Sequence, residues 1–116
     1  MKLAIVGSRN LNVQNIGEYL PDGVTEIVSG GARGIDSTAA TYARQNGIPL
    51  VEFLPDYPRY RRAAPLKRNQ QIADYADALL AFWDGQSRGT LYTINLFKKQ
   101  NKPVTIVRCD SEGTPV

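Results

Sequence analysis

The feature that most constrains the fold is a regular alternation between short apolar runs and stretches of helical spacing. Apolar runs of strand length occupy residues 2–6, 25–28, 50–54, 78–83 and 104–107. Between them, apolar side chains recur at helical intervals over residues 13–20, 35–46, 64–76 and 90–99. Alternation of this kind predicts a parallel sheet with right-handed crossovers.

We therefore expect an α/β fold, a Rossmann-like three-layer α/β/α domain around a five-stranded parallel sheet of order 3-2-1-4-5. The C-terminal ends of parallel strands share one edge of the sheet, and in this order the first and fourth strands flank the switch point where ligands bind. The loops after the first, second and fourth strands are therefore predicted to converge. The domain is expected to span residues 1–108, and residues 109–116, which show no pattern, are expected to form a loose tail.

The loop after the second predicted strand, SGGARGID at residues 29–36, carries the clearest signal for a ligand. Its three glycines allow a tight turn and a close approach of the backbone to a ligand. The free N–H groups of the helix that begins here favour an anion. Arg33 adds a cation or points to solvent, and Asp36 caps the first turn or holds a ribose hydroxyl. For this segment alone, a turn that only serves backbone geometry is an equal alternative.

Two other strand ends carry similar loops, Gly7-Ser8-Arg9 after the first strand and DGQSRGT at residues 84–90 after the fourth. The alternatives are a polar turn at Ser8 and Arg9 and a simple N-cap at Thr90. Because all three loops should meet at one edge, a nucleotide-type ligand explains them better than three unrelated turns. The loop residues predicted to bind it are Gly7, Ser8, Arg9, Ser29, Gly30, Gly31, Arg33, Gly34, Asp36, Asp84, Gly85, Ser87, Gly89 and Thr90.

The composition excludes several classes of protein. A chain of 116 residues has the size of one domain, and its longest apolar runs are far too short to cross a bilayer. The single cysteine, Cys109, cannot form an internal disulfide, and the absence of histidine removes the commonest general base and argues against a zinc site. We expect a cytoplasmic protein with no signal peptide, no membrane partner, no metal and no cofactor.

Positive charge is concentrated after the third predicted strand, in a loop predicted for residues 55–62 and the helix that follows it. The cations of this segment are Arg59, Arg61, Arg62, Lys67 and Arg68. Their mixture with tyrosines suits base stacking and phosphate contact, whereas charge alone favours a solvated surface. The net charge of +3 is too small to indicate nucleic acid by itself.

Taken in order, these segments resemble the SLOG superfamily, which joins DNA-processing protein A, the LOG phosphoribohydrolases and small YpsA/YspA-like proteins. The resemblance rests on the three loops and on Arg68-Asn69, it covers residues 2–107, and the single-domain form is most similar to the YpsA/YspA branch. It implies a Rossmann-like fold, a homo-oligomer and a pocket for nucleotides, nucleotide-derived molecules or nucleic-acid phosphates. It also adds Arg68 and Asn69 to the predicted site.

Two departures from the family pattern bear on activity. LOG enzymes carry a glutamate three residues after the Gly-Thr pair, which supports cleavage of the base–ribose bond, and Thr93 stands at that position here. DNA-processing proteins carry a histidine in the helix after Gly-Ile-Asp, where this chain has Ala39 and Ala40.

We therefore predict a binding or sensor module for a nucleotide or nucleotide-derived ligand such as ADP-ribose, with no catalytic residue. One alternative is a single-stranded DNA binder that uses residues 59–68 and the tyrosines, with an affinity that falls steeply with salt. The other is a nucleotide N-glycosidase or phosphoribohydrolase, in which Asp84 would orient a ribose or a water molecule.

Overall fold

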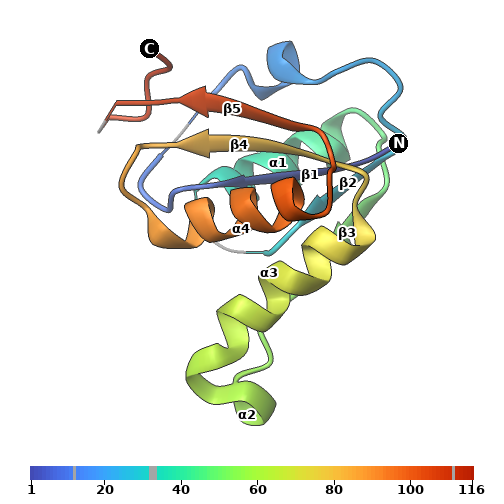
Figure 1. Cartoon of the computed structure of the whole chain (residues 1–116). Coiled ribbons are helices and arrows are strands. Elements are labelled where there is room, and N and C mark those ends of the chain that lie inside the picture. Colours follow the sequence, from blue (N-terminus) through green and yellow to red (C-terminus); the bar gives the residue numbers. More distant parts are fainter. Residues whose placement is uncertain (12, 32–33, 111) are drawn as a thin grey trace.

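The computed structural model describes residues 1–11, 13–31, 34–110 and 112–116, and it contains a five-stranded sheet (Figure 1). The strands are β1 (Lys2–Gly7), β2 (Glu26–Ser29), β3 (Leu50–Glu52), β4 (Ala78–Trp83) and β5 (Val104–Arg108). All neighbouring strands are parallel and their order is β3-β2-β1-β4-β5. The predicted fold class and strand order are therefore confirmed.

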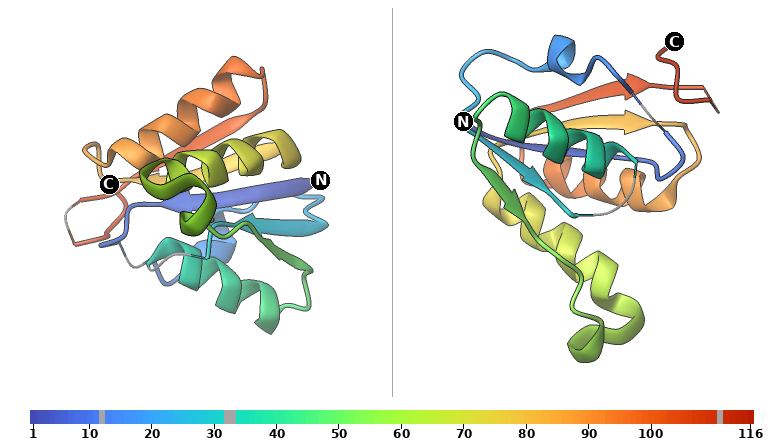
Figure 2. Two further views of the ribbon diagram at one scale, coloured as in Figure 1. Left: turned by 90° about the horizontal axis from the view of Figure 1, so that it is seen from below. Right: turned by 180° about the vertical axis from the view of Figure 1, so that it is seen from behind.

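Helices cover both faces of the sheet (Figure 2). Helix α1 (Ile35–Gln45) and the 3-10 turn η1 (Ile16–Tyr19) pack on one face, where they share a hydrophobic cluster with Leu3 and Ile5 of β1. Helices α3 (Ala64–Tyr75) and α4 (Arg88–Lys99) pack on the other face. This arrangement explains why β1 is apolar along most of its length, since a strand covered on both faces has no solvated side.

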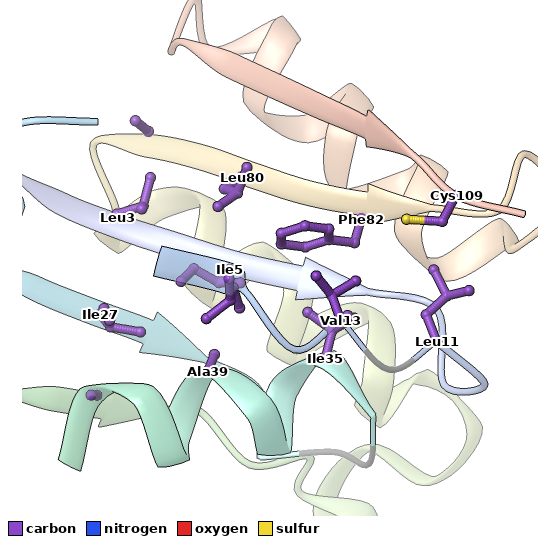
Figure 3. Packing of buried hydrophobic residues seen from close by; sticks show 13 residues of the cluster. Leu3, Ile5, Leu11, Val13, Ile27, Ile35, Ala39, Leu80, Phe82 and Cys109 are labelled. Carbon is purple, nitrogen blue, oxygen red and sulfur yellow. The ribbon is translucent and has the colours of Figure 1, made fainter. Parts of the chain in front are cut away.

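The two clusters alternate along the central strands. Leu3, Ile5, Leu80 and Phe82 point toward α1 and the segment that follows β1 (Figure 3), whereas Ala4, Leu79 and Ala81 point toward α3 and α4. Burial of both side-chain sets fixes the register of β1 and β4, because a slip by one residue would exchange the two faces.

The segment between β1 and β2 differs from the prediction. A helix was expected over residues 13–20, but only the four residues of η1 are helical. Asn15 precedes the turn without a side-chain cap, and Gly17 lies so close to the ring of Tyr42 that an added Cβ would come 2.6 Å from Cε1. A short, uncapped stretch containing glycine is marginal as an isolated helix, so the chain instead buries its apolar residues at irregular intervals.

The segment after β3 also differs from the prediction. The strand ends at Glu52 rather than at residue 54, and the expected loop contains α2 (Tyr57–Tyr60) and the 3-10 turn η2 (Arg61–Ala63). Asp56 caps α2 by accepting a hydrogen bond from the Arg59 N–H at 3.3 Å. We call residues 54–67 the arm, because Figure 1 shows α2 and the start of α3 extending away from the sheet. Leu66, in the first turn of α3, is exposed.

The C-terminal residues are more ordered around β5 than a loose tail would be. Cys109 is buried in the cluster on the α1 face and pairs with Pro115 across an antiparallel bridge. The Val116 N–H donates to the Arg108 carbonyl at 2.9 Å. The domain boundary after residue 108 stays a prediction. Among the residues that the structure describes, no helix is both long enough and apolar enough to cross a membrane.

Candidate anion-binding site

A cavity of about 140 Å³ lies at the C-terminal edge of the sheet, beside the end of β1. We call it the inner cavity. The loops after β1, β2 and β4 meet there, and the first half of α3 forms a fourth part of the wall. The predicted residues that line it are Gly7, Arg9, Gly30, Asp36, Arg68, Asn69, Ser87, Gly89 and Thr90.

Arg68 is held at the wall of the inner cavity by two hydrogen bonds. Its Nη1 donates to the Gly30 carbonyl at 2.7 Å, and its Nε donates to Oδ1 of Asn69 at 2.8 Å. A Cβ added to Gly30 would come 2.5 Å from Nη1. A side chain at position 30 would therefore displace the Arg68 guanidinium from its place against the Gly30 backbone.

Among the described residues, the charged groups that line the inner cavity are two guanidinium groups and one carboxylate. Burial lowers the pKa of Arg68, the nearby Asp36 and Tyr57 act in the opposite direction, and the positive charge of Arg9 lowers the pKa further. Asp36 is buried next to Gly30, whereas Arg9 is exposed. Two cations facing one carboxylate leave a positive charge at the cavity, and such a site favours an anion.

The first turn of α4 forms the wall nearest to β4. Ser87 is the N-cap, and its Oγ accepts a hydrogen bond from the Thr90 N–H at 3.4 Å and donates to Oγ1 of Thr90 at 3.2 Å. The alternative that Thr90 is the N-cap is therefore wrong. Gly89 has open space where a side chain would project, so a ligand can approach its backbone closely. Amide groups at a helix N-terminus and the positive end of the helix dipole both attract anions.

Residues 1–60 match the model of a family described as the YspA, cpYpsA-related SLOG family. The chain belongs to this family. The SLOG membership predicted from the sequence is confirmed, and the matched half holds the loops after β1 and β2 but neither Arg68 nor α4.

The SLOG domain is also similar to the X-ray structure of DNA processing protein A (DprA) from Streptococcus pneumoniae, with a TM-score of 0.72 and 23% sequence identity. The match covers 90% of this chain and 49% of that one, so this chain spans about half the length of the DprA chain. At this identity the likeness shows a shared fold. No curated protein matches the chain.

Other predicted residues shape the loops of the SLOG domain without lining the inner cavity. Ser29 is buried, and its Oγ accepts a hydrogen bond from the Gly31 N–H at 3.3 Å. Gly34 has a φ of 71° and is the N-cap of α1, so Asp36 lies within the first turn of this helix and not at its N-cap. A Cβ on Gly34 would come 2.5 Å from the Arg9 carbonyl oxygen. Arg33 lies outside the described residues.

Asp84 and its neighbours hold the loop between β4 and α4. Oδ1 of Asp84 accepts hydrogen bonds from the N–H groups of Ser87 and Gln86, both at 2.8 Å. These bonds, together with the nearby hydroxyl of Ser8, lower the pKa of the Asp84 carboxyl. Ser8 Oγ is buried and makes no hydrogen bond of good geometry with the described residues. Asp84 therefore positions the start of α4, and it is not among the residues that line the inner cavity. Gly85, with a φ of 82°, lies against the Arg108 guanidinium, away from the inner cavity.

A second, larger space adjoins the inner cavity. This outer chamber has a volume of about 540 Å³ and shares Arg9, Gly30 and Arg68 with the inner cavity. Its remaining wall is formed by Asn10, Gly31, Pro55 and Tyr57. The arm thus closes one side of a chamber whose other side is the glycine turn after β2.

Several lining residues were not among the predicted ones. Thr93 lines the inner cavity one helical turn after Thr90, and Ile72 lies one turn after Arg68, so helical spacing from the predicted residues would have found both. Pro65 and Val6 also contact the cavity. Tyr57 lies in the segment whose tyrosines the sequence marks as suited to base stacking, but its place beside this site depends on the path of the arm.

Proposed function

We propose that this SLOG domain is a binding or sensor module for a nucleotide or nucleotide-derived ligand, ADP-ribose-like or otherwise phosphate-bearing. The observation that carries the proposal is the Arg68 guanidinium, fixed by two hydrogen bonds and facing the same cavity as Arg9 and the first turn of α4. Asp36 offsets one of the two positive charges of Arg68 and Arg9, and a bound anion would account for the positive charge that remains. Membership of the SLOG family supports a nucleotide- or DNA-binding module at the level of the family.

The size of the inner cavity indicates which part of the ligand it holds. Complete small-molecule sites usually measure about 300–1,000 Å³, whereas the inner cavity measures about 140 Å³. This volume suits a phosphate group rather than a whole nucleotide. The rest of the ligand would then lie in the outer chamber, which shares its cationic wall.

The contacts of the candidate catalytic groups support binding rather than hydrolysis. The Asp84 carboxylate accepts two backbone hydrogen bonds at the loop before α4. The Thr93 hydroxyl, at the position where LOG enzymes carry glutamate, donates to the Gly89 carbonyl at 3.1 Å. Both groups are thus engaged in holding the start of α4.

The arm favours a second candidate function, binding of single-stranded DNA. Arg59, Arg61, Arg62 and Lys67 are exposed along it, together with Tyr57, Leu54 and Leu66. Exposed cations beside aromatic and apolar groups suit a flexible polyanion whose bases stack. Binding of this kind predicts that log Kd rises steeply with log salt, because each neutralised phosphate releases counterions.

Native mass spectrometry of freshly purified protein tests the proposal, together with calorimetric titration of ADP-ribose. We expect a retained phosphate-bearing small molecule, or one ADP-ribose bound per chain after titration, and a mass corresponding to a homo-oligomer. Absence of a retained nucleotide together with no saturable binding of ADP-ribose or inorganic pyrophosphate would contradict the proposed ligand. Tight, strongly salt-dependent binding of an oligothymidylate in their place would favour the DNA-binding alternative.

A further inference from the structure

The outer chamber contains an aromatic ring at its edge. Tyr57 is the first residue of α2, and Asp56 and Pro58 fix the start of this short helix. Tyr57 is half exposed, with an exposed fraction of 50%. The ring lines the outer chamber together with Arg9 and Arg68, and it is close enough to Arg68 to influence that guanidinium electrostatically.

Tyr60, one turn further along α2, shows what is particular about Tyr57. The Tyr60 ring already has two cationic neighbours, with Arg59 5.2 Å and Lys67 5.7 Å from the ring centroid. Within the described part of the chain, Tyr57 has neither a ring partner nor a cation over its face. An exposed tyrosine that lines a chamber and keeps its ring face open can stack on a flat group.

The position of Tyr57 relative to the cations also defines which flat group would lie there. Arg68 and Arg9 line both the inner cavity and the outer chamber, so a ligand whose phosphate contacts them extends into the outer chamber. In a nucleoside phosphate the base is separated from the phosphate by one ribose. The volume of about 540 Å³ leaves room for a ribose and a base beside the wall formed by Gly30, Gly31 and Pro55.

We propose that Tyr57 is the base platform of this site, on which the nucleobase of the ligand stacks while its phosphate lies in the inner cavity. This inference rests on the proposed function and adds a positioning residue to it. Because every base has a π face, one tyrosine can stack on any of them. The site should therefore bind a ligand with a base more tightly than one without a base, whichever base it is. The arm would then serve the small-ligand site directly, through Tyr57, rather than only presenting cations to solvent.

The test compares ligands that differ only by the base. Affinities of AMP, CMP and ribose 5-phosphate are measured by NMR titration for the unmodified chain and for the Tyr57→Leu, Tyr57→Phe and Tyr92→Leu variants. Tyr92 is a matched control, because it is an exposed tyrosine on α4 that lines neither the inner cavity nor the outer chamber. Circular dichroism of each variant verifies that it is folded.

We expect both nucleotides to bind the unmodified chain about tenfold more tightly than ribose 5-phosphate, the size of a typical base–aromatic stacking contribution. Tyr57→Leu should abolish this advantage and leave ribose 5-phosphate binding unchanged, whereas Tyr57→Phe and Tyr92→Leu should retain it. Equal affinities for AMP and ribose 5-phosphate, or an advantage that survives Tyr57→Leu, would overturn the base platform while the phosphate site stands. Failure of all three compounds and of pyrophosphate to bind would overturn the proposed function as well.

Discussion

The inner cavity takes one of its cations, Arg68, from the run of sequence that also supplies the cations of the arm, but the structure places them differently. Arg68 is half-buried and hydrogen-bonded to the turn after β2 and to its own helix, whereas Arg61 and Arg62 are exposed on η2. Their elements cause the difference, because η2 lies in the arm, which extends away from the sheet (Figure 1), whereas Pro65, Arg68 and Asn69 of α3 line the cavity. A fixed, partly desolvated cation binds an anion more strongly than a mobile one screened by water and salt. Arginines that lie within one short stretch of sequence therefore need not belong to the same functional site.

The loops at the C-terminal edge of the sheet depend on close backbone contacts. We expect the largest loss of stability where a substitution disrupts one of these contacts. Gly34→Ala should lower the free energy of unfolding by about 3 kcal/mol, through strain at a positive φ and the clash with the Arg9 carbonyl. Urea denaturation measures the change. Gly47 is the matched control, because its φ is 65° and an added Cβ would meet no atom within 4 Å, so Gly47→Ala should cost about 1 kcal/mol. Equal losses for both variants would show that the contact at Arg9 is unimportant.

Removing one cation from each region compares them directly. Arg68→Ala should weaken ADP-ribose binding by about 1–3 kcal/mol, since a charge-assisted hydrogen bond to phosphate is lost. Arg62→Ala should change that affinity by less than about 0.5 kcal/mol, as for an exposed charge. Isothermal titration calorimetry gives both values. The comparison would be reversed, and the DNA-binding alternative favoured, if Arg62→Ala had the larger effect.

Substitution of Gly89 should have a smaller effect, and it should change ligand affinity and folding stability in opposite directions. A methyl group here meets no protein atom, and alanine is a better helix former than glycine, so Gly89→Ala should raise the free energy of unfolding by up to about 1 kcal/mol. The same methyl group would lie in the space through which a ligand approaches the first turn of α4, and ADP-ribose affinity should fall. Thermal denaturation and calorimetry of the same sample test both statements. An affinity equal to that of the unmodified chain would place the phosphate away from this turn.

The smallest expected effect is a loss of folding stability at acid pH that comes from the loop before α4. Hydrogen bonds from Ser87 and Gln86 lower the pKa of Asp84 below its ordinary value of 3.8. The carboxylate therefore contributes stability that is present above that value and is lost as the pH falls through the lowered pKa of the folded state. Between pH 7 and pH 3, unfolding experiments should show a smaller loss of stability for Asp84→Asn than for the unmodified chain. Asp22→Asn, in an exposed turn before β2, should retain the full loss.

The architecture was predictable because it follows from apolar patterning. The central strands β1, β2 and β4 are buried on both faces and read as apolar runs, whereas the partly exposed edge strands β3 and β5 were recognised from short apolar runs between helical segments. The alternation of strands and helices placed the switch point between β1 and β4. Convergence of the three loops at one edge followed from the same topology. The helix expected before β2 was wrong because a short helical spacing with an internal glycine does not reveal whether a helix can nucleate.

The detailed roles of the site residues were harder to predict because they depend on local hydrogen bonds and on the path of the arm. Asp84 looked available for a ligand, but its carboxylate accepts N–H groups only two and three residues away. Arg68 was assigned to the site by family resemblance, since a run of cations does not show which of the side chains points into a site. Tyr57 reaches the outer chamber through the turn of α2, where the sequence predicted a loop.

A crystal structure of the protein with ADP-ribose tests the phosphate site most directly. We predict one phosphate group of the diphosphate in the inner cavity, within hydrogen-bond distance of the Arg68 side chain and of the Gly89 N–H. Density for the diphosphate along Arg59 and Arg62, with the inner cavity filled by the protein's own side chains, would contradict the account.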